Sequence, residues 1–191
     1  VVSAITFGTV IMFGCIGETI NQKAGNLNLG VPGIMQLGGI GALTGAFIYE
    51  SSTATPNGTI GMICALLCAI LASALGSLIY SFLTVTLKAN QNVTGLTLTI
   101  FGTGIANFFA GSLMKLSGGV GSISVATTAN VFKLRLPFIS GKLGLFGSLF
   151  LNYGWMAYFC LVLAFVANYF LTKTRIGLNL RAVGENPATA D

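Results

Sequence analysis

Apolar residues fill most of the chain in long stretches, and the charged residues lie between them. Five stretches carry no formal charge: residues 1–17, 24–49, 51–87, 89–114 and 143–172. A membrane-crossing helix needs about 20 predominantly apolar residues, because the hydrocarbon core is roughly 30 Å thick. In lipid such a stretch forms a helix, since a helix satisfies its own backbone hydrogen-bonding groups. The pattern therefore predicts an all-α, polytopic membrane protein with about five membrane helices, at residues 1–17, 30–49, 60–87, 93–114 and 151–172.

Two of these segments have unusual lengths. Residues 1–17 are short for a crossing and the chain starts without Met, so we expect a helix that is cut at its beginning, in a fragment of a longer protein. A cleaved signal peptide is disfavoured, because no basic n-region precedes the apolar residues. Residues 60–87 exceed one crossing at about 1.5 Å per residue. We expect this segment to tilt or to extend past the membrane.

The composition supports a protein that faces lipid. Only 7% of the residues are charged, 54% are hydrophobic and the mean hydropathy is +0.87, whereas soluble domains carry about a quarter charged residues. The nine Lys and Arg residues are scattered singly. A nucleic-acid-binding surface would instead gather them on one face, so the expected partner is the lipid bilayer and no nucleic acid.

The sequence offers little for catalysis or metal binding. It has no His, and its four Cys lie inside apolar stretches. Cys64 and Cys68 are one helical turn apart, but two thiols without further ligands make a poor metal site. We interpret the four Cys as small buried hydrophobic residues, and we expect no metal, no cofactor and no enzymatic activity.

Small residues recur at helical spacing within the predicted spans. Examples are Gly41 and Gly45 in one segment, and Ala72 and Gly76 in the next. Small residues at this spacing let membrane helices approach closely. Helix packing is therefore the preferred interpretation, and a hinge role is the alternative.

The chain ends in a polar segment, TRIGLNLRAVGENPATAD, at residues 174–191. Arg175 follows the last apolar stretch and should end its helix at the membrane interface, and Gly177 permits a bend. Asn186 followed by Pro187 is a good helix start, because Asn caps free amide groups and Pro fits the first turn. A short helix after a span suits docking to a partner, and an ordinary loop fits the same residues equally well.

Charge alone does not orient the chain. If the C-terminal segment is cytoplasmic, residues 18–29 and 88–92 are also inside, and residues 51–59 and 115–150 are outside. The inside segments then hold five Lys and Arg residues and the outside segments hold four. This difference is too small for the positive-inside rule to decide.

The same C-terminal segment resembles the cytoplasmic loop of ABC importer permeases of the branched-chain amino acid, simple sugar and nucleoside class, with the nucleoside-type subgroup as the nearest fit. The matching residues are Thr174, Arg175, Gly177, Arg181, Ala182, Gly184, Glu185, Asn186 and Pro187. Residues 17–43 are similar to an early segment of these permeases through Gly17, Glu18, Lys23, Gly25, Asn28, Leu29, Gly30, Gly33, Ile34, Met35 and Gly38. Pro32 departs from the family pattern, which often has Glu there. Residues 89–102 form a third, weaker match.

The resemblance implies a function and a set of partners. Residues 1–191 would form a single, partial transmembrane permease domain, truncated at both ends, in the bacterial plasma (inner) membrane. This subunit would import a small polar solute, a nucleoside or simple sugar, with a second permease subunit as homo- or heterodimer partner. A separate ABC ATPase would supply the energy, since the chain has no phosphate-binding loop motif, and an extracytoplasmic solute-binding protein would deliver the solute. The alternative is a secondary transporter or channel without an ATPase.

The resemblance also assigns roles to residues. It places the cytoplasmic coupling loop at residues 173–191, with Arg175, Gly177, Arg181, Gly184, Glu185, Asn186 and Pro187 contacting the ATPase. We hypothesise that Gly184 lets the backbone turn into the ATPase groove. Arg181 and Glu185 are four residues apart, so they either pair with each other or face the partner.

A broken, Gly- and Asn-containing backbone precedes the second segment, and such backbone is tolerated in membranes only where it is buried or faces a cavity. We hypothesise that the translocation path is lined by Asn28, Gly30, Gly33, Gln36 and Asn107. Hydrogen bonding between helices explains these polar side chains equally well.

Overall fold

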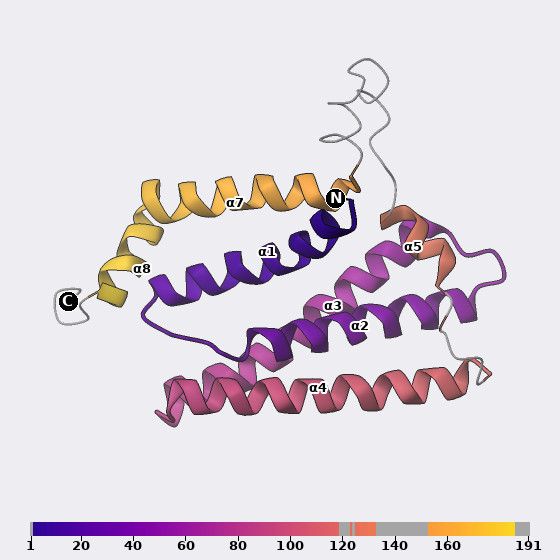
Figure 1. Cartoon of the computed structure of the whole chain (residues 1–191), viewed down its shortest axis with the longest axis horizontal. Coiled ribbons are helices and arrows are strands. Elements are labelled where there is room, and N and C mark those ends of the chain that lie inside the picture. Colours follow the sequence, from indigo (N-terminus) through magenta and orange to yellow (C-terminus); the bar gives the residue numbers. More distant parts are fainter. Residues whose placement is uncertain (1, 119–122, 124, 133–152, 186–191) are drawn as a thin grey trace, which may run out of the picture. The chain divides into compact units, whose positions relative to one another are not determined.

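The computed structural model describes residues 2–118, 123, 125–132 and 153–185 (Figure 1). Its helices are α1 (Val2–Lys23), α2 (Val31–Ser52), α3 (Gly58–Ser81), the π-helix η1 (Phe82–Thr86), α4 (Gln91–Leu116), α5 (Ala126–Phe132), α7 (Trp155–Lys173) and α8 (Arg175–Glu185). Among the described residues, five segments are long and apolar enough to cross a membrane: Ala4–Lys23, Val31–Ser52, Gly58–Thr86, Gln91–Leu116 and Trp155–Lys173. The predicted all-α, polytopic fold is confirmed.

The chain forms two compact units. One contains residues 1–28 and 132–191, and the other contains residues 29–131. The single permease domain expected from the sequence stays a prediction.

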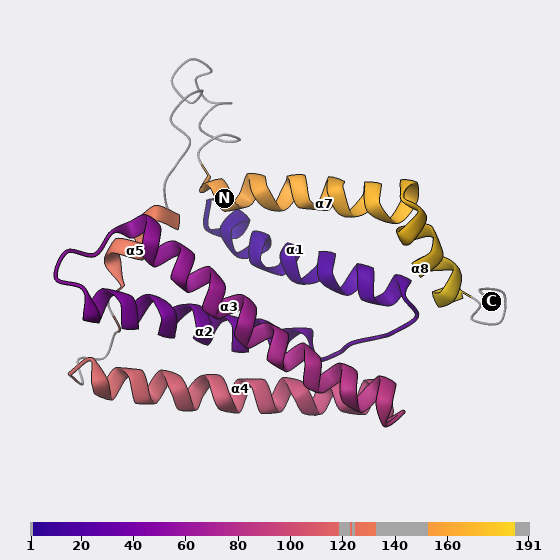
Figure 2. The ribbon, with the colours of Figure 1, turned by 180° about the vertical axis from the view of Figure 1, so that it is seen from behind.

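Helix α2 is central in the unit of residues 29–131, where it contacts both α3 and α4 (Figure 2). A Cβ atom on Gly41 would lie 2.7 Å from the Cβ of Ala72, and one on Gly45 would lie 2.7 Å from the Sγ of Cys68. Real side chains do not approach so closely, so α2 and α3 pack through their glycines. The packing interpretation of these glycines is confirmed.

The long third span ends in a π-helical turn. The whole span has 29 residues and therefore measures about 43 Å at 1.5 Å per residue, longer than one bilayer core. Helix α3 ends at Ser81, and in η1 the amide of Leu87 donates to the carbonyl of Phe82, at 3.1 Å. This hydrogen bond spans five residues, and such turns are rare outside functional or strained sites.

Helix α4 begins two residues earlier than predicted because Asn90 caps it. The side-chain oxygen of Asn90 accepts hydrogen bonds from the amides of Asn92, at 3.0 Å, and Val93, at 3.4 Å. These contacts satisfy amide groups that a helix start leaves free. Lys88 precedes this cap with a φ of 51°, which helps to reverse the chain between the third and fourth spans.

A short helix from the predicted outside loop docks on the same unit. The Oε1 atom of Glu50, near the end of α2, accepts a hydrogen bond of 2.7 Å from the amide of Thr128 in α5. A carboxylate at this position satisfies a free amide in the first turn of α5. A Cβ on Gly61 would meet the Thr128 hydroxyl, so α5 lies directly on the start of α3.

In the other unit, α1 packs against α7. Cys160 is fully buried in α7, and its thiol donates to the carbonyl of Thr9 at 3.8 Å. The ring centroids of Phe13 and Phe159 are 6.2 Å apart. Burial of Cys160 agrees with its interpretation as a small hydrophobic residue, whereas Cys15 is exposed.

Helix α1 extends six residues beyond the predicted end at residue 17, to Lys23. Glu18 therefore lies on a helix rather than in a loop. Its Oε1 atom accepts hydrogen bonds of 3.1 Å from the Nε2 of Gln22 and the amide of Asn28. These two donors explain why a carboxylate is tolerated near the end of a span.

Candidate functional site

Helix α8 starts directly after the last span, at a turn formed by Thr174. The Thr174 hydroxyl donates to the carbonyl of Phe170 at 2.6 Å and accepts from the amide of Gly177 at 3.1 Å. It thus links the end of α7 to the start of α8. Gly177 is buried, and a Cβ there would collide with the Phe170 carbonyl.

Within the predicted coupling loop of residues 173–191, most of the described residues are helical. Residues 175–185 form α8, and the bend lies at Thr174, with Gly177 already inside the helix. The sequence analysis placed the helix start after residue 185 and did not identify the role of the Thr174 hydroxyl. Asn186 and Pro187, the predicted helix start, lie outside the described residues.

The pairing of Arg181 with Glu185 is confirmed. The Nη2 of Arg181 donates to the Oε1 of Glu185 at 3.4 Å, across one turn of α8. Exposed ion pairs of this kind contribute about 0.3–0.5 kcal/mol. Arg175 is exposed at the start of the same helix, so the positive charge of α8 that has no ion-pair partner within the helix lies at its start.

The last turn of α8 rests on the turn that follows α1. A Cβ on Gly184 would collide with the carbonyl of Lys23 and would lie 2.8 Å from the nitrogen of Gly25. Gly25 has a φ of 84°, in the left-handed region that favours glycine, and its own Cβ would lie 3.1 Å from the Cα of Gly184. Only glycine at residue 184 permits this backbone-to-backbone contact.

Residues 23–28, which we call the docking turn, are also held from α1. The amide of Asn26 donates to the carbonyl of Asn21 at 3.2 Å, and Glu18 holds the amide of Asn28. Helix α8 is thus fixed at its start through Thr174 and at its end through the docking turn. The chain continues directly from Asn28 into Leu29 and α2.

Two of the predicted path residues, Gln36 and Asn107, meet in one cavity between α2 and α4. This mid-span cavity has a volume of about 310 Å³ and is lined by Gln36, Gly39, Ile40, Leu43, Thr103, Ala106, Asn107 and Ala110. The sequence analysis missed Thr103. A helical face drawn through Asn107 would have included it, because residues four apart share a face.

The other predicted path residues do not line this cavity. Gly30 is the N-cap of α2, and Pro32 in the first turn suits a helix start. A Cβ on Gly33 would lie 2.5 Å from the carbonyl oxygen of Leu98, so Gly33 brings α2 against α4. Asn28 contributes its backbone amide to the docking turn. Whether these residues contact a solute stays a prediction.

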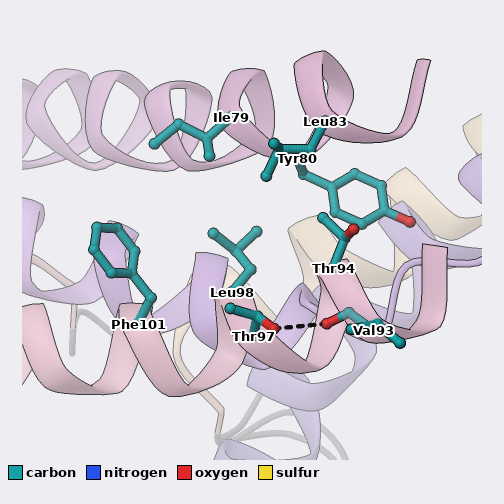
Figure 3. A pocket seen from close by; sticks show the side chains of 8 residues that line it. All are labelled: Ile79, Tyr80, Leu83, Val93, Thr94, Thr97, Leu98 and Phe101. Carbon is teal, nitrogen blue, oxygen red and sulfur yellow. Dashed lines mark hydrogen bonds between the residues drawn. The ribbon is translucent and has the colours of Figure 1, made fainter. Parts of the chain in front are cut away.

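A second cavity of about 300 Å³ lies between α3, η1 and α4 (Figure 3). Its lining is mostly apolar and includes Leu83, Leu98 and Phe101. The Thr97 hydroxyl donates to the carbonyl of Val93 at 2.8 Å, so its hydrogen is already engaged. This lining suits hydrocarbon better than a polar solute.

Comparison with known protein families shows the family to which the chain belongs. The model of the family "Branched-chain amino acid transport system / permease component" matches residues 1–191. The chain belongs to this permease family. With five candidate spans, this permease is a multi-pass protein of the inner membrane.

Relatives of this permease carry transport descriptions. It is 29% identical, over 99% of its length, to the "Putative glucose ABC transporter permease protein TsgC13" of Haloferax volcanii, of which it covers 52%. It is 28% identical over its whole length to the "Nucleoside ABC transporter permease protein NupC" of Lactococcus lactis, covering 57%. It is 24% identical, over 99% of its length, to the "Guanosine ABC transporter permease protein NupQ" of Bacillus subtilis, covering 56%. The chain thus spans about half the length of these relatives, and no solved structure matches it.

Proposed function

We propose that this permease is the membrane-spanning subunit of an ATP-driven ABC importer that moves a small polar solute, a nucleoside or a simple sugar. The observation that carries the proposal is the family match over residues 1–191. Relatives described as glucose, nucleoside and guanosine permeases support the solute class. A solute-binding protein delivers the solute, and a second permease subunit, identical or related, completes the path.

Energy comes from a separate ATPase that contacts residues 173–191. Arg175, Arg181 and Glu185 are the charged groups that α8 offers to such a partner. Gly177 and Gly184 contribute by holding α8 against the chain, and Asn186 and Pro187 extend the contact. Coupling requires two arrangements of the permease that the nucleotide state favours differently.

The docking turn gives this coupling a route. We expect a displacement of α8 to move residues 23–28 through the contact at Gly184, and the chain reaches the start of α2, at Val31, three residues after Asn28. Helix α2 carries Gln36 in the mid-span cavity. Asn28, Gly30, Gly33, Gln36 and Asn107 remain the proposed path residues, with Gln36 and Asn107 as those that face a cavity.

The test uses the full-length permease, co-expressed with the ATPase and the binding protein encoded beside it. We expect uptake of radiolabelled nucleosides or sugars that requires ATP and is inhibited by vanadate. A matched strain carries an ATPase in which the lysine of the phosphate-binding loop is replaced by alanine, and it should show no uptake. Uptake that persists in this strain and follows an ion gradient would contradict the proposal and indicate a secondary transporter or channel.

A further inference from the structure

We infer that the mid-span cavity is a contact site for an uncharged polar solute, and that it disfavours zwitterionic amino acids. This inference rests on the proposed function and adds the charge of the cargo and the residues that select it. Residues that line the cavity come only from α2 and α4, within the unit of residues 29–131.

The residues of α4 that line the cavity lie in the middle and the second half of this candidate span. Thr103, one of its lining residues, is 12 residues from the start of α4 at Gln91 and 13 from its end at Leu116. At 1.5 Å per residue it is therefore about 18–20 Å from either end of the helix. Polar side chains at this depth are costly in hydrocarbon and usually face a cavity or the bundle interior.

The polar groups in the cavity are available for a ligand. Gln36 and Asn107 are exposed, and neither carboxamide has a hydrogen-bond partner in the part of the chain that the structure describes. Each carboxamide offers two donors and an acceptor oxygen. The Thr103 hydroxyl donates to the carbonyl of Thr99 at 2.7 Å, so its oxygen remains as an acceptor.

The remaining lining residues shape the space. Gly39, Ala106 and Ala110 are small, whereas Ile40 and Leu43 are apolar. A few polar groups within an apolar wall are typical of sites for small molecules, and about 310 Å³ lies at the lower end of their size range. The ring of a sugar or a nucleoside has the matching chemistry, with hydroxyl, carbonyl or amino groups on its edge and apolar faces.

No lining residue of the cavity carries a charge. The only charged residue of α2 is Glu50, seven positions beyond Leu43, and the only one of α4 is Lys115, five positions beyond Ala110. An amino acid would bring an ammonium and a carboxylate group into this region without a counter-charge from the lining residues, and the desolvation of such groups is unfavourable. A neutral solute avoids this penalty.

The test compares variants of the full-length permease, with its partner subunits, in uptake assays at matched levels of folded protein. We expect Gln36→Leu and Asn107→Leu each to lower the uptake efficiency for the neutral solute about 5- to 10-fold, as expected for one lost hydrogen bond. Asn107→Asp keeps the shape of the side chain but replaces the amide donor, and it should show a similar loss. The matched control is Asn92→Leu, which removes an exposed carboxamide from the first turn of α4, outside the cavity, and should leave uptake within about 2-fold, the range of surface substitutions.

A selectivity measurement separates a binding role from a structural one. We expect the wild-type permease to prefer the parent solute over an analogue that lacks one hydroxyl or amino group, and at least one Leu variant to lose that preference. Unchanged uptake and preference in both Leu variants would overturn the inference. The inference would also be overturned if the Leu variants gave less folded protein but normal uptake per folded subunit. That result would mean that Gln36 and Asn107 contact another helix rather than the solute.

Two further outcomes distinguish the inference from the proposed function. Uptake of leucine by the wild-type permease as efficient as that of a nucleoside or sugar would overturn the inference and leave the importer function intact. Solute uptake by the wild-type permease that does not require ATP would overturn the proposed function itself, before any variant is compared.

Discussion

At the scale of single residues, the contact between Gly184 and the docking turn has the least tolerance for change. The atoms that a Cβ on Gly184 would meet belong to the backbone of residues 23–25, so they cannot move aside by changing a rotamer. Gly25 faces the same contact from the other side with a φ of 84°. Both positions are therefore restricted by geometry rather than by contact with a partner protein alone.

We expect Gly184→Ala to separate the end of α8 from the docking turn and to lower the free energy of unfolding by about 1–3 kcal/mol, as overpacked sites do. ATP-driven uptake should fall together with protection of the amides of residues 175–185 in hydrogen exchange. Gly17→Ala is the matched control, because a Cβ there meets no atom within 4 Å. Equal protection and uptake in both variants would show that α8 does not depend on this contact.

At the scale of helices, the crossing of α2 and α4 depends on two facing glycines. A Cβ on Gly33 would lie 2.6 Å from the Cα of Thr99, and one on Gly102 would lie 2.5 Å from the carbonyl oxygen of Gly33. The Thr99 hydroxyl also donates to the carbonyl of Leu29 at 2.9 Å. Together these contacts set the spacing of the two helices that line the mid-span cavity.

Gly33→Ala should push α2 away from α4 and lower the thermal midpoint of the detergent-purified permease by several degrees. The matched control is Gly104→Ala in α4, where a Cβ meets no atom within 4 Å and where alanine also has the better helix propensity. If Gly33→Ala and the control had the same thermal midpoint, α2 and α4 could move apart without loss of stability. The contact at Gly33 would then not set their spacing.

The five spans could be predicted from the sequence, because a bilayer imposes a length and a polarity that are visible in composition. Helix ends were harder to predict where local hydrogen bonds decide them. Helix α1 continues past Glu18, whose Oε1 atom accepts hydrogen bonds from Gln22 and Asn28. The start of α8 depends on the Thr174 hydroxyl. Gly184 serves a contact with residues 23–25, which are distant in sequence, and local patterns do not reveal such a contact.

The candidate site was predictable only in part for the same reason. Gln36 and Asn107 were identified as polar residues within apolar segments, and the structure brings them together in one cavity. Gly30 and Gly33 were grouped with them because a broken, Gly-containing backbone in a membrane is tolerated only where it is buried or faces a cavity. In the folded chain Gly33 packs against α4 instead. Whether a residue lines the cavity or packs between helices depends on the direction that it faces, which the sequence alone does not give.

At the scale of the whole molecule, the number of spans fixes which segments share a side of the membrane. The docking turn and α8 both follow odd-numbered crossings, so they should lie on one face, and the connection between α2 and α3 should lie on the other. The proposed function assigns the first face to the cytoplasm, where an ATPase can reach α8.

Single cysteines introduced into a variant without the four native Cys check this arrangement. We expect Val183→Cys, in α8, to react with a membrane-impermeant maleimide only in inside-out vesicles. Asn57→Cys, between α2 and α3, should react only in whole cells or right-side-out vesicles. Labelling of residue 183 from the outside would place α8 beyond the reach of any cytoplasmic ATPase and would contradict the coupling proposal.

The π-helical turn at Phe82–Thr86 has a consequence for evolution at the end of the third span. A π turn holds one more residue than the corresponding α-helical turn, and each residue of an α-helix advances the side-chain direction by about 100°. A one-codon deletion there would restore regular α-helical spacing and shorten the connection between Tyr80 and Asn90, the cap of α4, by one residue. Homologous sequences that keep the turn should therefore conserve the number of residues between Tyr80 and Asn90 more strictly than their identities.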